Sequence, residues 1–214
     1  MKLTETKETS KSYSNEIIKT IFERRAVRKF KEKPVENEII LELLEAARMA
    51  PSAMNKQPWH FYILTDKEKI QLFSKAILHN SKLAMLKAGV KEIVNHILHP
   101  NSFHLKDGID FFKTDDPIFH AAPVVIFISS DRSNDWAHLD VGMCAQNMML
   151  AAKSLGLDSC PVGFAKFIEN TDEYKKLNIP SSEEINLAII IGYGNENPKF
   201  HDRKKDNATF INNM

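Results

Sequence analysis

The sequence predicts an α+β fold in which helices pack on a modest central sheet, mixed or antiparallel. Segments with apolar residues at helical spacing interleave irregularly with short apolar runs, without the regular succession of βα units that builds a parallel sheet. The sequence contains no internal repeat. Because 214 residues with 43% hydrophobic content can be organised around one core, we expect a single domain over residues 1–214.

Two helices are expected before residue 51. Ser14 can cap the first, while the second starts after Pro34 and is stopped by Pro51. Each carries apolar residues at helical spacing, which predicts one apolar face per helix. These residues are Ile17, Ile18, Ile21 and Phe22 in the first helix, and Ile39, Ile40, Leu43, Leu44 and Ala47 in the second.

The middle of the chain is predicted to hold a strand, a helix and an insertion. The stretch from His60 to Thr65 has the composition of a strand, and Asp66 opens a helix. Over residues 78–118 the pattern becomes mixed, with a helical stretch at 83–97 followed by Pro100 and Gly108. We therefore interpret residues 78–118 as an insertion within the domain.

Two buried strands and two helices are expected in the remainder. Apolar runs at 123–129 and 185–193 predict the strands, and a strand end with a loop is expected at 159–164. The helix predicted at 136–155 carries apolar side chains around most of its circumference, which implies burial on several sides, as in a subunit interface. Thr171 is expected to cap a short helix.

Composition excludes several classes of protein. The 29 Lys+Arg and 28 Asp+Glu residues leave a formal charge of +1, so no overall field favours nucleic acid or an anionic membrane. No apolar run approaches the roughly 20 residues that span a bilayer. The N-terminus lacks the apolar segment of a secretory signal, so we expect a cytoplasmic location. Cys144 and Cys160 fit no paired zinc or redox motif and are expected to be reduced, buried thiols.

Common catalytic motifs are missing, but a basic cluster stands out. The sequence has no GxxxxGKS/T, GxSxG or HExxH, and Gly-Tyr-Gly at 192–194 lacks the third glycine of a dinucleotide fingerprint. Residues 24–29, here called the basic knot, hold four cations: Arg24, Arg25, Arg28 and Lys29. Guanidinium groups match phosphate in bidentate geometry, which suggests an anion site. The alternative is a solvated patch of cations at a helix C-terminus.

The loop at residues 51–59 is a second candidate for ligand binding. Its sequence, PSAMNKQPW, places Ser52, Asn55 and Gln57 between two prolines, directly before a strand. Prolines stiffen a chain, so these polar groups would be presented in a fixed array, as a planar heteroaromatic ligand requires. The alternative is an ordinary connection in which Trp59 anchors the core.

A metal site is the competing interpretation. His96, His99 and His104 lie near Asp107 and Asp110 in the sequence, and the first two are one helical turn apart. Most such pairs are helix-surface residues, and no downstream spacing completes a known site. We therefore expect no metal.

Taken in order, these segments resemble the FMN-dependent nitroreductase family over residues 17–205. The matching features are the Arg-Arg-x-x-Arg knot, the PSxxNxQPW loop leading into HFYIL, the AAPVVIFI strand, a helix ending LAAKSLGL, then PVGF, and IIIGYG followed by a basic tail. Residues 78–118 match poorly. In the family this region forms a lid over the flavin, where Phe103, Phe111 and Phe112 could stack on an aromatic substrate.

The resemblance implies roles for residues at the two ends of the chain. Arg24, with Arg203 and either Lys204 or Lys205, would hold the FMN phosphate; the alternative for the tail is a charged end without structure. Ala26 stands where the family usually has serine, so Arg25 or backbone would substitute for that contact. Arg28 would lie beside the pyrimidine edge of the flavin, where positive charge stabilises the reduced anion.

The resemblance also implies that each site is built from two chains of an intertwined homodimer. Pro51, Ser52, Ala53, Asn55 and Gln57 would reach the flavin from the other subunit. Pro161, Val162 and Gly163 would place backbone against flavin N5, with glycine permitting close approach. The alternative for this second segment is a turn that ends a strand.

The implied activity is that of an NAD(P)H-dependent FMN oxidoreductase. NADH or NADPH would deliver hydride to flavin N5, and a nitroaromatic or quinone acceptor would then take the electrons in a ping-pong sequence. No side chain is required as a general acid or base in the first half-reaction. Flavin-dependent chemistry of another kind, such as dehalogenation or flavin destruction, and a flavin-binding dimer without turnover are the alternatives.

Overall fold

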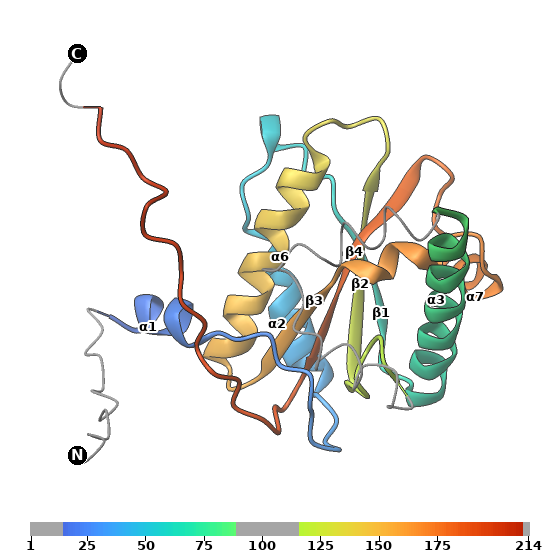
Figure 1. Ribbon diagram of the computed structural model, residues 1–214, viewed down its shortest axis with the longest axis horizontal. Coiled ribbons are helices and arrows are strands. Elements are labelled where there is room, and N and C mark those ends of the chain that lie inside the picture. The colour runs from blue at the N-terminus through green and yellow to red at the C-terminus, as the bar shows by residue number, and fades with distance from the viewer. Residues whose placement is uncertain (1–14, 89–115, 212–214) are drawn as a thin grey trace, which may run out of the picture.

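A computed structural model describes residues 15–88 and 116–211, and its architecture is the predicted α+β fold (Figure 1). Four strands form one sheet in the order β1-β2-β4-β3, and every pairing is antiparallel. The strands are β1 (His60–Leu64), β2 (Val124–Asp131), β3 (Asp158–Val162) and β4 (Glu183–Gly192). The strands predicted at 60–65, 123–129 and 185–193 are thereby confirmed.

Both faces of the sheet are covered, which explains the continuous apolar runs of β2 and β4. Helices α2 (Asn37–Arg48) and α6 (Ala137–Ser154) lie on one face, where Ile126, Ile189 and Ile191 pack. Helix α3 (Lys67–Ala88) and the 3-10 segment η2 (Gly163–Ile168) cover the other. Figure 1 shows the sheet between these two layers.

The N-terminal helices confirm the predicted pattern, with one change of cap. Helix α1 (Glu16–Glu23) is capped by Asn15, whose side chain accepts a hydrogen bond from Ile18 N at 2.9 Å. Ser14, the expected cap, lies outside the described residues. Helix α2 buries Ile40, Leu43, Leu44 and Ala47, as expected.

Helix α6 is buried on one side only within a single chain. The prediction of a helix at 136–155 is confirmed, and Val141, Cys144 and Met148 are fully buried. Trp136 and Leu139, however, are 60% and 57% exposed. Burial on several sides is therefore not achieved by the described part of one chain.

Helix α3 runs unbroken through residue 78, where the expected insertion begins, to Ala88, because Ile70, Phe73 and Ile77 repeat at helical spacing and are buried against the sheet. At the other end of the predicted range, residues 116–118 are buried in the core. The described residues do not include positions 89–115. The competing interpretation of a metal site and the expectation of an aromatic lid concern this range, and all of their residues fall in it: His96, His99, Phe103, His104, Asp107, Asp110, Phe111 and Phe112.

Three smaller predictions concern local features. Thr171 caps helix α7 (Asp172–Lys176), its hydroxyl accepting from Tyr174 N at 3.0 Å, as predicted. Cys144 and Cys160 are free and buried, as predicted. Within residues 15–88 and 116–211, no helix is long and apolar enough to cross a membrane.

Candidate functional site

The basic knot is fastened to the outer edge of β3. Ala26 forms a parallel bridge with Ser159, and Val27 N donates to Ser159 O at 3.1 Å. The knot thus adds one bridged residue, Ala26, to the edge of the sheet, with Arg24 and Arg28 two residues away on either side.

Three arginines from the two ends of the chain gather beside this edge. Burial, followed by the charge of Arg25, lowers the pKa of Arg24, and the charge of Arg203 on the C-terminal tail adds to the effect. In the described part of the chain, no carboxylate forms an ion pair with any of these three arginines. A cluster of cations without a carboxylate partner, in which Arg24 and Arg25 are half-buried and Arg203 is exposed, is suited to an anion.

Arg28 lies on the same edge, but its neighbours are Glu196 and His120 rather than other arginines. Its backbone N–H donates to Glu196 Oε1 at 2.5 Å. Its positive charge, together with burial as the larger cause, lowers the pKa of His120. Burial raises the pKa of the Cys160 thiol, which Arg28 and Arg24 partly oppose. Arg28 is therefore next to both the β3 edge and the turn that carries His120.

Arg25, a member of this cluster, also bonds to backbone carbonyls, whereas the two tail lysines assigned to the site are exposed. The Arg25 guanidinium donates to the carbonyl oxygens of Phe22 and Arg24, at 2.5 and 3.0 Å, so it satisfies carbonyls at the C-terminus of α1. Lys204 and Lys205 are exposed on the tail.

Val162 and Gly163 lie where β3 passes into η2. Gly163 is exposed, and a Cβ built on it would meet no atom within 4 Å. Packing within the described chain therefore does not demand glycine here, and the open space beside the backbone permits a flat ligand to approach. Pro161, one residue before Val162, is also exposed.

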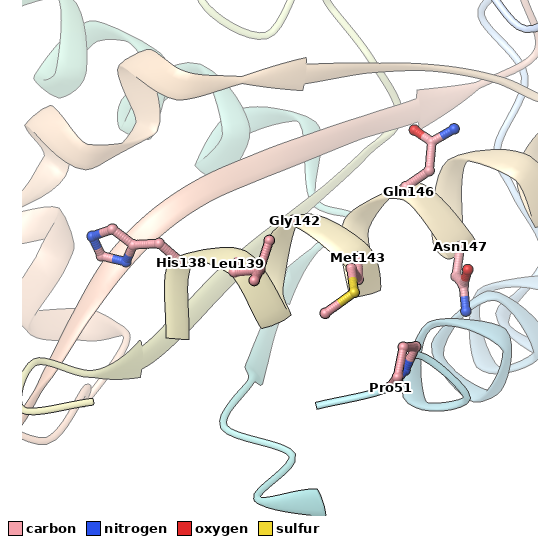
Figure 2. A pocket seen from close by; sticks show the side chains of 7 residues that line it. All are labelled: Pro51, His138, Leu139, Gly142, Met143, Gln146 and Asn147. Atoms are coloured by element: carbon pink, nitrogen blue, oxygen red, sulfur yellow. The ribbon is translucent and has the colours of Figure 1, made fainter. Parts of the chain in front are cut away.

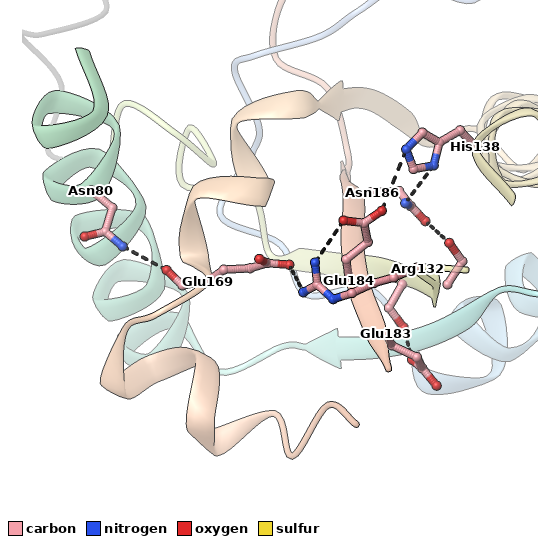
Figure 3. A network of polar contacts seen from close by, with 9 residues as sticks. Asn80, Arg132, His138, Glu169, Glu183, Glu184 and Asn186 are labelled. Atoms are coloured by element: carbon pink, nitrogen blue, oxygen red, sulfur yellow. Dashed lines mark hydrogen bonds and ion pairs between the residues drawn. The ribbon is translucent and has the colours of Figure 1, made fainter. Parts of the chain in front are cut away.

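The far end of η2 is anchored by polar contacts (Figure 3). Asn80 Nδ2, from α3, donates to the carbonyl oxygens of Phe167 and Glu169 at 3.1 and 3.0 Å. Arg132 Nη2 contacts the Glu169 carboxylate at 2.8 Å, and its Nη1 contacts Glu184 at 3.1 Å. The 3-10 segment is thus held to α3 and to β4 at the end opposite Gly163.

The loop at residues 51–59 has an unusual backbone conformation that hydrogen bonds hold in place. Met54, Asn55 and Gln57 have φ angles of 52°, 54° and 46°, in the left-handed region that side chains disfavour. Hydrogen bonds hold this backbone: Gln57 N donates to Ser52 Oγ at 2.9 Å, and Ala53 N donates to both carboxylate oxygens of Asp140 at 3.2 Å. Trp59 is buried, as the alternative for this loop expected.

Within one chain, this loop and the basic knot lie at opposite ends of α6. Asp140, in the first turn of α6, holds the loop, whereas Lys153, in its last turn, contacts Asp158 at 3.1 Å beside the residue that fastens the knot. Thirteen residues of α-helix separate the two points by about 20 Å. Figure 1 shows α6 running between these two ends.

A shallow cavity of about 380 Å³ lies along the uncovered side of α6 (Figure 2). Pro51 closes one end of it. The remaining lining residues all come from α6: His138, Leu139, Gly142, Met143, Gln146 and Asn147. The 51–59 loop therefore begins beside an exposed, largely apolar helix surface.

Two residues that position these segments were not identified in the sequence. Asp140 is 1% exposed and holds the loop from 87 residues away, and Glu196 binds the knot from 168 residues away. Neither belongs to a local motif. The acidic residue in an apolar stretch of α6 was the only available signal for Asp140. No three or more His, Cys, Asp or Glu side chains among the described residues are grouped to hold a metal ion.

The family model, a curated relative and a solved structure that this chain resembles all point to one protein family. The model of the Nitroreductase family matches residues 21–193. A 4-nitrobenzoate reductase from Pseudomonas putida is 33% identical, over 81% of this chain and 83% of that protein. An iodotyrosine deiodinase from Thermotoga neapolitana is 27% identical, over 83% and 88%. The crystal structure of a nitroreductase with bound FMN from Desulfitobacterium hafniense superposes with a TM-score of 0.74 at 24% identity, over 93% of this chain and all of that one (100%).

Proposed function

The chain belongs to the nitroreductase family, and on that premise we propose that it is a homodimeric FMN-dependent oxidoreductase. NADH or NADPH is the electron donor, and nitroaromatic compounds are the favoured acceptors, with quinones as a second class. The similarity to a 4-nitrobenzoate reductase supports nitroaromatic reduction.

The observation that carries the proposal is the cation cluster at the edge of β3. Arg24, Arg25 and Arg203 come together from opposite ends of the sequence, and no ion pair within the described residues neutralises them. A phosphate dianion satisfies such a cluster, and guanidinium groups bind it in bidentate geometry. The exposed Gly163, whose Cβ position is open, leaves room for a flat ring along the same strand edge. These residues fit FMN.

FMN, when held by these residues, would supply the redox chemistry, namely two-electron exchange between a nicotinamide donor and the acceptor. The chain binds and orients the reactants. Arg28 places positive charge near the end of β3, which favours a negatively charged reduced ring. The backbone N–H of Gly163 would donate to the ring, which the open space beside this residue supports. The described side chains are not required to act as a general acid or base for the first half-reaction.

The site is completed by a second copy of the chain. One chain attaches the 51–59 loop and the basic knot near opposite ends of α6, at helix positions about 20 Å apart, so we infer that the two segments serve different sites. The exposed apolar side of α6, with Leu139 57% exposed, supplies a surface through which two copies can join. The loop of one copy then faces the knot of the other.

Reduction under anaerobic conditions tests the proposal. The protein reconstituted with FMN should be yellow, and its absorbance near 450 nm should be lost when about one equivalent of NADH or NADPH is added. Addition of a nitroaromatic such as nitrofurazone should restore it. Bound flavin that neither nucleotide reduces would refute the oxidoreductase assignment and leave the fold unaffected.

Reductive dehalogenation is a second candidate function. It is favoured by the 27% identity to an iodotyrosine deiodinase over 83% of this chain. Iodide release from iodotyrosine by the reduced protein would support it. Nitroaromatic turnover without iodide release would exclude it.

A further inference from the structure

The C-terminal tail, residues 193–211, begins antiparallel to residues 28–31, which include the end of the basic knot. Successive residues from 193 to 196 meet successively earlier residues from 31 to 28. The contacts are Lys31 N to Tyr193 O at 2.8 Å, a bridge between Phe30 and Gly194, Asn195 N to Lys29 O at 2.8 Å, and Arg28 N to Glu196 Oε1 at 2.5 Å. The tail therefore approaches Arg25 and Arg24 as it proceeds.

Phe200 is the next point of attachment. Arg25 Cζ lies 4.9 Å from the centroid of the Phe200 ring, and Arg203 Cζ lies 5.5 Å from it. The ring is 49% exposed, so burial alone does not explain its position. Guanidinium groups are attracted to the negative face of an aromatic ring, so two such contacts link the ring to both arginines.

The guanidinium of Arg25 is itself immobilised. It donates to the carbonyl oxygens of Phe22 and Arg24 at the end of α1. The ring of Phe200 therefore rests on a fixed cation, and Arg203 is held by the ring. Arg203 Nη1 also donates to the carbonyl oxygen of His201 at 2.9 Å, which turns its side chain back along the tail.

This arrangement opposes the repulsion between like charges. The charges of Arg25 and Arg203 both lower the pKa of Arg24, which shows that the three cations lie within electrostatic reach. Without an attractive contact, a flexible tail would move Arg203 away from the other two. The ring supplies that contact before any anion binds, so the cluster is preorganised for a dianion.

We propose that Phe200 is a positioning residue, which holds Arg203 beside Arg24 and thereby gives the site its preference for a phosphorylated flavin. The inference rests on the proposed function, because it takes the FMN phosphate as the anion. It concerns the phosphate alone. Recognition of the isoalloxazine ring should not depend on Phe200.

Comparison of FMN with riboflavin tests this directly, because riboflavin lacks only the phosphate. Dissociation constants of the cofactor-free protein are measured for each compound by quenching of flavin fluorescence. In Phe200→Leu, which keeps an apolar side chain without a π face, FMN binding should weaken about five- to tenfold. Riboflavin binding should stay within about twofold of its original value. Phe200→Trp, which restores an aromatic face, should recover FMN affinity.

The control is Phe210→Leu, the same change at an 87% exposed position of the same tail, which should leave both constants unaltered. FMN binding by Phe200→Leu equal to that of the Phe210→Leu control would overturn the inference. So would an equal loss of FMN and riboflavin affinity, because a general structural role acts on both. Equal binding of FMN and riboflavin by the unaltered protein would refute the proposed phosphate site itself, and the role of Phe200 with it.

Discussion

Asp116 is the buried carboxylate whose replacement has the most predictable effect on stability. It is 3% exposed and precedes β2. Its Oδ1 accepts hydrogen bonds from Phe119 N, at 2.8 Å, and from the hydroxyl of Ser74. Its Oδ2 accepts a hydrogen bond from Ala121 N at 3.1 Å. These bonds hold a turn in which His120 and Ala121 have φ angles of 56° and 54°. Because this backbone is intrinsically unfavourable, it depends on the carboxylate.

Asp116→Asn keeps the shape and exchanges one acceptor oxygen for an NH₂ donor. If the amide oxygen faces Ser74 and Phe119, the NH₂ group faces Ala121 N, and that bond is lost. The new NH₂ donor is buried with the side chain and lacks an acceptor, which costs about 1–3 kcal/mol, and the two remaining bonds lose the charge of the acceptor, about 1 kcal/mol each. We expect a loss of about 3–5 kcal/mol. For a chain of this size that corresponds to a decrease in Tm of about 6–20 °C.

Thermal unfolding followed by circular dichroism, at one fixed protein concentration, measures the effect. Asp135→Asn is the matched control, because Asp135 is exposed, and such surface changes alter stability by less than about 0.5 kcal/mol. The reasoning is refuted if Asp116→Asn unfolds within a degree or two of the Asp135→Asn control.

Further predictions concern the cations, His120 and Cys144. Arg24→Ala should weaken FMN retention by about tenfold or more, through loss of charge-assisted bonds, whereas Arg28→Ala should alter the flavin reduction rate or potential more than affinity; unchanged values in both would contradict their placement. The pKa of His120 is lowered, chiefly by burial, so the unfolded chain binds more protons near neutrality and stability should fall as pH decreases through the ordinary imidazole value of about 6.5. Asparagine tolerates the same backbone conformation, so in His120→Asn the free energy of unfolding, measured by denaturant at pH 7 and 5.5, should fall less between the two pH values than in the unaltered protein; an equal fall in both proteins would contradict this. Burial raises the pKa of the Cys144 thiol to about 12, so at pH 8 only about one molecule in 10⁴ carries the thiolate; mass spectrometry should find Cys144 unmodified by iodoacetamide in the folded protein, and labelling at the rate of free cysteine would refute this.

The elements that the sequence predicts correctly are those specified by local pattern. Helix α2 lies between two prolines and carries one apolar face, and Thr171 caps α7 through a residue three positions away. The runs of β2 and β4 indicate strands buried on both faces. In contrast, the sequence does not indicate that α3 continues to Ala88, because its apolar stripe weakens before the helix ends.

The candidate site was predicted only in part, because much of it depends on distant contacts. Four cations within residues 24–29 indicated an anion site, and the family resemblance added Arg203. The different setting of Arg25 at the end of α1, the alignment of the tail along the knot and the anchoring of Ala53 by Asp140 all join residues far apart in the chain. Spacing in one sequence carries no information about such pairs.

Sharing of each site between two copies is the central claim, and mixing two defective chains tests it most directly. One chain carries Arg24→Glu in the knot, and the other carries Ser52→Ala with Asn55→Ala in the loop; neither alone should retain FMN. After unfolding and refolding together, half of the dimers are mixed, and each has one site with both defects and one intact site. About a quarter of all sites should then bind FMN. If the mixture binds no more FMN than the separate variants, knot and loop do not meet across two copies.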